Sequence, residues 1–293
     1  FINVPVAGIV IILGPRWVPE SVSDSIPDKV DLFSVPLASL GVGIAILAIT
    51  QGDKWGWSSL NLILSFIIAF LLVTAFILRS QRHSAPLFDL DLFKLKTFSV
   101  GMIGTVFFMV AFFSWLISLP TFIQSVWGWS VLKTGFAIAP APLLTAFVSP
   151  PAGRIVERIG NGPILTIGGL LGAAGLTLHL IFTNTQPDYF MGIFIPGILI
   201  GFAAGFGFAQ LIGAAMRDVP RDQFGMAGAG RTTIFQLALA FGVALAFTII
   251  GRPDSPQAAL DGLQTTWILG IFCYIGQTLL FALFGGSDKT LAT

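Results

Sequence analysis

Long runs of apolar residues, separated by short polar connections, make up most of the sequence. Hydrocarbon about 30 Å thick is crossed by roughly 20 helical residues, because each residue rises about 1.5 Å. Eight runs reach that length or come close enough to span with some tilt. We therefore expect eight transmembrane helices, at 32–50, 58–78, 98–123, 134–150, 163–182, 190–213, 225–250 and 266–285.

Two further segments are apolar but too short to span a bilayer. Phe1–Leu13 opens the sequence without an initiator Met and without the charged segment that precedes the apolar core of a signal peptide. We expect it to be the remainder of a helix cut by the start of a fragment. Pro86–Lys94 alternates apolar and charged residues, which is typical of a segment lying along the membrane surface.

The composition excludes a soluble enzyme and a disordered chain. Of the 293 residues, 55% are hydrophobic and 10% are charged, whereas soluble domains carry roughly a quarter charged residues. Disordered chains need low hydrophobicity, and here the mean hydropathy is +0.90. The net charge of +1 gives no basic face for a nucleic acid. We expect an all-α polytopic protein of the plasma (inner) membrane, with the lipid bilayer as its surroundings.

The basic residues are sorted between the two sides of the predicted membrane topology. Connections on one side hold twelve of the fifteen Lys and Arg residues, and the other side holds Lys54, Lys133 and Arg252. An excess of Lys and Arg marks the cytoplasmic side, so the C-terminal residues 285–293 are expected in the cytoplasm. The twelve are Arg16, Lys29, Arg79, Arg82, Lys94, Lys96, Arg154, Arg158, Arg217, Arg221, Arg231 and Lys289.

Carboxylates are absent from the central part of the predicted spans, and the chain shows no catalytic or metal-binding motif. Every carboxylate falls outside the central part of the spans, where an unpaired one would cost about 2.5–3.5 kcal/mol. No intramembrane proton carrier is therefore evident in this chain. There is also no cluster with metal-ligand spacing, nucleophile–base set or phosphate-binding loop. We expect neither an enzyme nor a cofactor.

The connection after the fourth predicted span carries a recognisable pattern. Gly153, Arg154, Glu157, Arg158 and Gly160 resemble the G-x-x-x-D-R-x-G loop of the major facilitator superfamily, with Glu in place of the usual Asp. Two glycines permit a tight turn, and an acid–arginine pair can lock neighbouring helix ends. The resemblance implies a cytoplasmic gating loop. The alternative is that the arginines only mark the cytoplasmic side.

Other stretches resemble one branch of that superfamily, the 14-spanner drug:proton antiporters. The similar stretches are Phe1–Pro5, Val18–Ser21, Pro86–Phe93, Leu119–Gln124 and Gly128–Gly135, in the order that the family has them. The resemblance implies a partial major facilitator fold over the whole chain. Residues 1–18 would be the end of helix six, residues 19–97 a linker with two inserted helices and a cytoplasmic segment, and residues 98–293 the C-terminal six-helix bundle.

One position departs from that family. Phe235 stands where its members tend to carry an arginine, and Arg231 lies one turn earlier. Arg231 either substitutes for that arginine or only extends its side chain toward the cytoplasmic surface. We expect the second.

The resemblance implies a function and the partners that it needs. The chain would be part of a proton-coupled secondary transporter that exports drugs or other small amphiphilic compounds by alternating access. Its partners would be the small-molecule substrate, protons and the missing N-terminal half of the same protein. Two alternatives remain open at this point: the same fold exporting a lipid, siderophore or secreted metabolite, and a truncated membrane protein that does not transport.

Three side chains inside the predicted spans are candidates for the wall of a substrate cavity. Gln210 and Gln236 are polar at membrane depth, and Trp115 could stack on an apolar cation. For the two glutamines, hydrogen bonding between helices is the alternative; for Trp115, it is ordinary packing or contact with lipid. Gln277 is expected to join helices. His179 is expected at the membrane interface or between helices, with a pH-sensing role as the alternative.

Overall fold

The chain is helical throughout the part that its computed structural model describes, which comprises residues 8, 31, 33–83, 90–251 and 253–285. Eight spans in this part are long and apolar enough to cross a membrane, which confirms the predicted number. Apart from residue 8, the expected end of helix six at 1–18 lies outside the described residues, as do the first linker residues and the C-terminal residues 286–293. The long helices are α2 (Ser34–Trp55), α3 (Leu60–Arg82), α4 (Lys96–Ser125), α5 (Val131–Ile138), α6 (Pro140–Ile159), α7 (Asn161–Phe182), α8 (Ile195–Met216), α9 (Phe224–Ile250) and α10 (Pro256–Phe284).

Two of the predicted boundaries are wrong in an informative way. The last helix begins at Pro256, ten residues before the predicted start, because the side chain of Ser255 accepts a hydrogen bond from the Ala258 N–H and Pro256 suits the first turn. The fourth span, predicted as 134–150, is two helices that meet at Pro140. Proline there starts a new helix because it lacks the N–H that would continue the old one.

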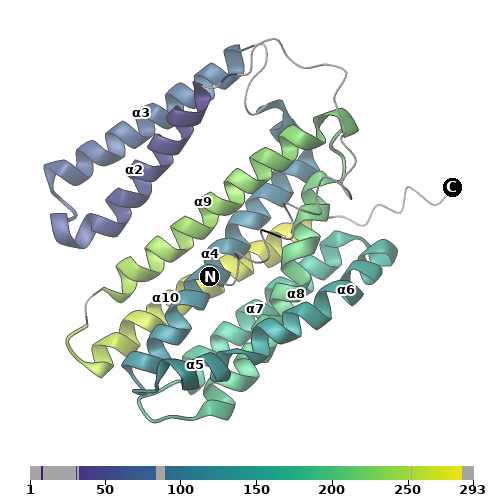
Figure 1. The fold of residues 1–293 in the computed structure, drawn as a ribbon. Helices are drawn as coiled ribbons and strands as arrows, with labels where there is room; N and C mark the ends of the chain where they lie inside the picture. Colours follow the sequence, from purple (N-terminus) through teal and green to yellow (C-terminus); the bar gives the residue numbers. More distant parts are fainter. Residues whose placement is uncertain (1–7, 9–30, 32, 84–89, 252, 286–293) are drawn as a thin grey trace.

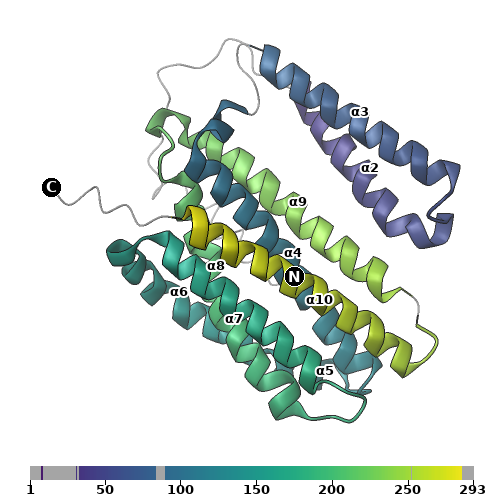
Figure 2. The same ribbon diagram turned by 180° about the vertical axis from the view of Figure 1, so that it is seen from behind.

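Helices α4 to α10 form one bundle, beside which the α2–α3 hairpin lies (Figure 1). Within the bundle, α8 contacts α4, α6 and α7, and α10 contacts α4, α7 and α9. The hairpin reaches the bundle through contacts of α2 with α9, and the view from behind shows it on the same flank (Figure 2). Most of α3 is exposed, as befits a helix surrounded by lipid.

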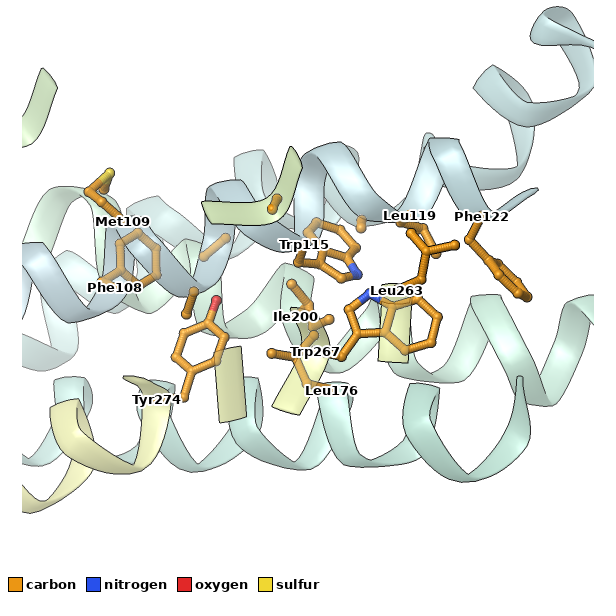
Figure 3. Packing of buried hydrophobic residues seen from close by; sticks show 14 of the residues in the cluster. Phe108, Met109, Trp115, Leu119, Phe122, Leu176, Ile200, Leu263, Trp267 and Tyr274 are labelled. Carbon is orange, nitrogen blue, oxygen red and sulfur yellow. The ribbon is translucent and has the colours of Figure 1, made fainter. Parts of the chain in front are cut away.

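Small residues allow the bundle helices to approach closely. A β-carbon at Gly207 would lie 2.3 Å from the Phe108 ring, and one at Gly172 would lie 2.7 Å from the Tyr274 ring. Both rings are fully buried, as Figure 3 illustrates. Membrane helices pack through such small residues because lipid provides no hydrophobic drive for association.

Short polar side chains add hydrogen bonds between helices. Thr145 and Ser149 of α6 donate to the Gly201 and Gly205 carbonyls of α8, each at 3.1 Å. The buried amide of Gln277 donates to the Leu165 carbonyl at 3.0 Å, joining α10 to α7. The expectation that Gln277 joins helices is therefore confirmed.

An ion pair ties the two ends of the hairpin together. The buried carboxylate of Asp31, just before α2, accepts hydrogen bonds from Ser34 and from the Arg79 guanidinium near the end of α3, the latter at 2.9 Å. Burial by itself would raise the pKa of Asp31, but the hydrogen bonds from Ser34 and Arg79 and the charge of Arg79 outweigh it and lower this pKa below its ordinary value.

Because α8 approaches α4 closely, replacing a glycine by alanine should destabilise the bundle by an amount that depends on the position. Gly207→Ala should lower the free energy of unfolding by about 1–3 kcal/mol, because the buried Phe108 ring must move. Gly228→Ala on α9 is the matched control, since nothing lies within 4 Å of its new methyl group. Reversible unfolding in mixed micelles measures both. Equal stability of the two variants would contradict the packing described here.

The ion pair of the hairpin predicts a dependence on pH. Because the folded pKa of Asp31 is lowered, its stabilising effect is complete above the unfolded pKa of about 4 and is lost as the pH falls through the lower folded value. Protection of the first-turn amides of α2 from hydrogen exchange, measured relative to the intrinsic exchange rate at each pH, should therefore fall on acidification in the wild type. Asp31→Asn should show low protection throughout, with no such step; a step of equal size in this variant would contradict the assignment.

Candidate functional site

A group of exposed polar side chains lies on α9 at membrane depth. Thr232, Thr233 and Gln236, called here the α9 polar stripe, are all exposed and share one face through their three- and four-residue spacing. The opposite face of α9 is buried, with Ala238 and Gly242 directed at α4. Neither threonine was predicted as a site residue, although two adjacent threonines in an apolar run are a usable signal.

Only some of the hydrogen-bonding groups of the α9 polar stripe have partners. Thr232 and Thr233 donate to the Gly228 and Ala229 carbonyls at 2.9 and 3.0 Å, each one turn earlier in the same helix. The amide of Gln236 makes no hydrogen bond within the part of the chain that the structure describes. Lipid would leave this amide unsatisfied, so the face of α9 that carries it calls for water or a protein partner.

Gln210 has different surroundings from Gln236. It is 6% exposed on α8, where it follows Ala203 and Phe206 along the face that packs on Gly168 of α7. Its amide makes no hydrogen bond among the described residues either. The structure therefore places Gln210 between helices and Gln236 on an open face.

Trp115 lies inside the bundle and takes part in a polar cluster that joins three helices. It is 3% exposed, and its indole N–H donates to His179 Nε2 at 3.1 Å. His179 of α7 is fully buried, and its Nδ1 lies 2.7 Å from the Gly192 carbonyl in the short π-helix Phe190–Phe194 before α8. Because a carbonyl only accepts, Nδ1 carries the proton and Nε2 accepts from Trp115. Of the two positions expected for His179, at the membrane interface or between helices, the structure shows the one between helices.

A second tryptophan extends this cluster to α10. The Trp267 indole N–H donates to Ser118 Oγ at 2.9 Å, and its ring centroid lies 5.3 Å from that of His179. Figure 3 shows Trp115 and Trp267 in the same buried cluster as Leu119 and Leu176. Burial of this kind favours a packing role for Trp115 in the present conformation.

The break between α5 and α6 is adjacent to Trp115. A small cavity of about 10 Å³ lies there, with Trp115, Pro140, Ile193 and Gly197 in its wall. That volume is close to the least that one water molecule needs. It is too small to hold a substrate.

The predicted gating loop is not a loop over most of its length. Gly153, Arg154, Glu157 and Arg158 all lie within α6, and only Gly160 forms the turn to α7, with a φ of 81°. Charged residues do not end a helix, whereas a glycine with positive φ does. The three charged side chains are exposed, and they form no ion pair with one another or with other described residues.

Basic residues from different helices meet at one end of the bundle. A cavity of about 240 Å³ brings together Lys96 at the start of α4, Asn161 at the start of α7, Arg217 after α8 and Gly285 after α10. Arg154 and Arg158 lie at the end of α6, which the Gly160 turn joins to this start of α7. We call this the basic end of the bundle.

Sequence comparisons relate the chain to membrane transporters. The uncharacterized transporter YebQ of Escherichia coli (strain K12) is 32% identical over 237 residues, which cover 78% of this chain and 50% of that protein. Multidrug resistance protein Stp of Mycobacterium tuberculosis is 29% identical over 254 residues, or 86% of this chain and 45% of that protein. Lincomycin resistance protein LmrB of Listeria monocytogenes is 26% identical over 300 residues, which cover 97% of this chain and 62% of that protein.

The chain spans about half the length of the first two of these relatives. The drug:proton antiporter resemblance found in the sequence is supported by the multidrug resistance names of Stp and of the Escherichia coli protein EmrY. A family model described as Major Facilitator Superfamily matches residues 32–243, which include the hairpin and most of the bundle. With eight apolar helices and this match, the chain belongs to the major facilitator superfamily.

Proposed function

We propose that this chain is part of a proton-coupled secondary transporter that exports drugs or other small amphiphilic compounds. Its bundle would work against an N-terminal six-helix half, and rocking between the two would alternate access to a site near the bilayer midplane. The basic end would face the cytoplasm of the cell, so that the C-terminus is cytoplasmic in the plasma membrane. The proton carrier would lie in the N-terminal half.

The observation that carries this proposal is the α9 polar stripe. Thr232 lies eight residues into α9, or about 12 Å from its start at about 1.5 Å per residue, which is well inside the hydrocarbon. An exposed amide such as that of Gln236 is costly in lipid, but it is useful beside water or a polar group of a substrate. A wall of small polar groups fits compounds with one apolar and one polar part.

The ends of α6 and α7 support the alternating movement. The exposed charges of Arg154, Glu157 and Arg158 at the basic end have no partner among the described residues, so they are available to a facing half. Gly160 connects the two helices through a single glycine turn. In the proposal, these charges pair across the halves when the transporter is closed at the basic end and separate when it opens.

Replacing the polar groups of the α9 polar stripe should impair export. Thr233→Val combined with Gln236→Leu should slow ethidium efflux by about five- to tenfold in cells expressing the full-length protein, as expected when contacts worth about 1–1.5 kcal/mol are lost. Thr265→Val is the matched control, because Thr265 is also exposed and also donates to a carbonyl one turn earlier. Equal efflux by all three proteins, at equal membrane abundance, would refute the proposed role of the stripe.

The charged residues at the end of α6 give an independent test of the proposed pairing across the two halves. Glu157→Gln with Arg158→Ala should reduce ethidium efflux while leaving the melting temperature nearly unchanged, because neither side chain has a partner within this chain's described residues. Lys54→Ala, which removes an exposed cation in the last turn of α2, serves as the control for the loss of a cation elsewhere. Wild-type efflux by the double variant would show that these charges do not hold the two halves together.

A further inference from the structure

An open apolar groove lies between the hairpin and the bundle. Its volume is about 420 Å³, and every side chain in its wall is apolar. It extends from Phe93, in the 3-10 helix Leu90–Lys94 just before α4, to Ile49 of α2 and Phe241 of α9. The remaining wall comes from α2, α3, α4 and α9, and its larger members are Val42, Ile46, Val73, Met102, Ile103, Val106 and Leu237.

The groove is open at membrane depth, so its occupant must be apolar. The two ends of the groove differ. Beside Ile49, the hydroxyl of Thr248 on α9 donates to the Ile49 carbonyl of α2 at 3.1 Å, and this bond joins the two helices beyond that end. Phe93 borders the other end, which is the basic end of the bundle. Exposed Ile103 and Val106 form part of the floor. An acyl chain from the leaflet at the basic end can enter this space along its length.

A cation lies one turn from the groove, and its long side chain can extend from within the span toward the level of the lipid headgroups. Arg231 precedes Ile234 by three residues, and Ile234, Leu237 and Phe241 form the α9 side of the groove. Arg231 is seven residues, or about 10 Å, from the start of α9, and arginine side chains extend toward the nearer interface. Its guanidinium lies over the Phe235 ring, 6.0 Å from the centroid, and pairs with no carboxylate of the described residues.

We propose that the groove between α2 and α9 binds one anionic glycerophospholipid, with an acyl chain in the groove and the phosphate on Arg231. The wall of the groove contains no carboxylate, which excludes a cationic amphiphile as the best match. Arginine binds phosphate through two parallel N–H donors, and basic sites between transmembrane helices favour anionic headgroups. The lipid would fill the gap between the bundle and the hairpin, whose described contacts with it run mainly between α2 and α9.

Native mass spectrometry of the full-length protein, titrated with phosphatidylglycerol or phosphatidylcholine, tests this site. The wild type should retain one phosphatidylglycerol with at least about fivefold preference over phosphatidylcholine, as one arginine near the surface provides about 1 kcal/mol. Arg231→Gln should lose that preference, whereas Arg82→Gln, an exposed arginine at the end of α3, should keep it. Equal binding by wild type and Arg231→Gln would overturn the assignment of the phosphate.

Filling the groove tests the position of the acyl chain. Val106→Trp should abolish retention of the lipid, while Val131→Trp, at an exposed position on α5, should leave it unchanged. Thermal unfolding of each protein without lipid verifies that the variants fold. Retention by Val106→Trp at the wild-type level, or displacement of the lipid by inorganic phosphate alone at millimolar concentration, would overturn the proposal.

Discussion

The structure depends on one constraint, which is that a polar group at membrane depth must find its partner within the protein or beside water. Lipid offers no hydrogen bonds, so each unsatisfied group costs several kcal/mol. Trp115, His179, Ser118 and Trp267 meet the constraint by bonding to one another or to backbone across helices. These bonds join α4 to α7 and α10, and they explain why bulky aromatic side chains gather at this level of the bundle.

Glycines allow the helices to come close enough for such hydrogen bonds to form. Hydrogen bonds such as those from Thr145 and Ser149 to the carbonyls of α8 require backbones close enough for a short side chain to reach. Gly201 and Gly205 allow that approach, since a β-carbon at either would lie 2.7–2.8 Å from atoms of α6. The hydroxyls of Thr145 and Ser149 on α6 are thus satisfied within the bundle, whereas α9 presents its polar stripe on an exposed face.

The sequence predicts most of the fold, because span length and charge placement follow directly from the thickness and the low polarity of the bilayer. Helix ends are less predictable: α6 continues through Arg154 and Arg158 because only the backbone of Gly160 ends it. The site is harder still. His179 and Trp115 are 64 residues apart, and their bond depends on how two helices are rotated, which apolar runs do not encode. Likewise, Gln210 and Gln236 look equivalent in sequence, yet one is buried and the other exposed.

The central claim is that the exposed polar face of α9 lies beside water or a facing half, and not in lipid. Labelling of single cysteines in membranes tests it most directly, with the native Cys273 replaced by serine. A cysteine at position 236 should react with a membrane-impermeant maleimide, because the reactive thiolate forms only where water reaches. A cysteine at position 272, where Phe272 is 68% exposed on α10, should stay unreactive in lipid. Equal protection of both cysteines would contradict the account.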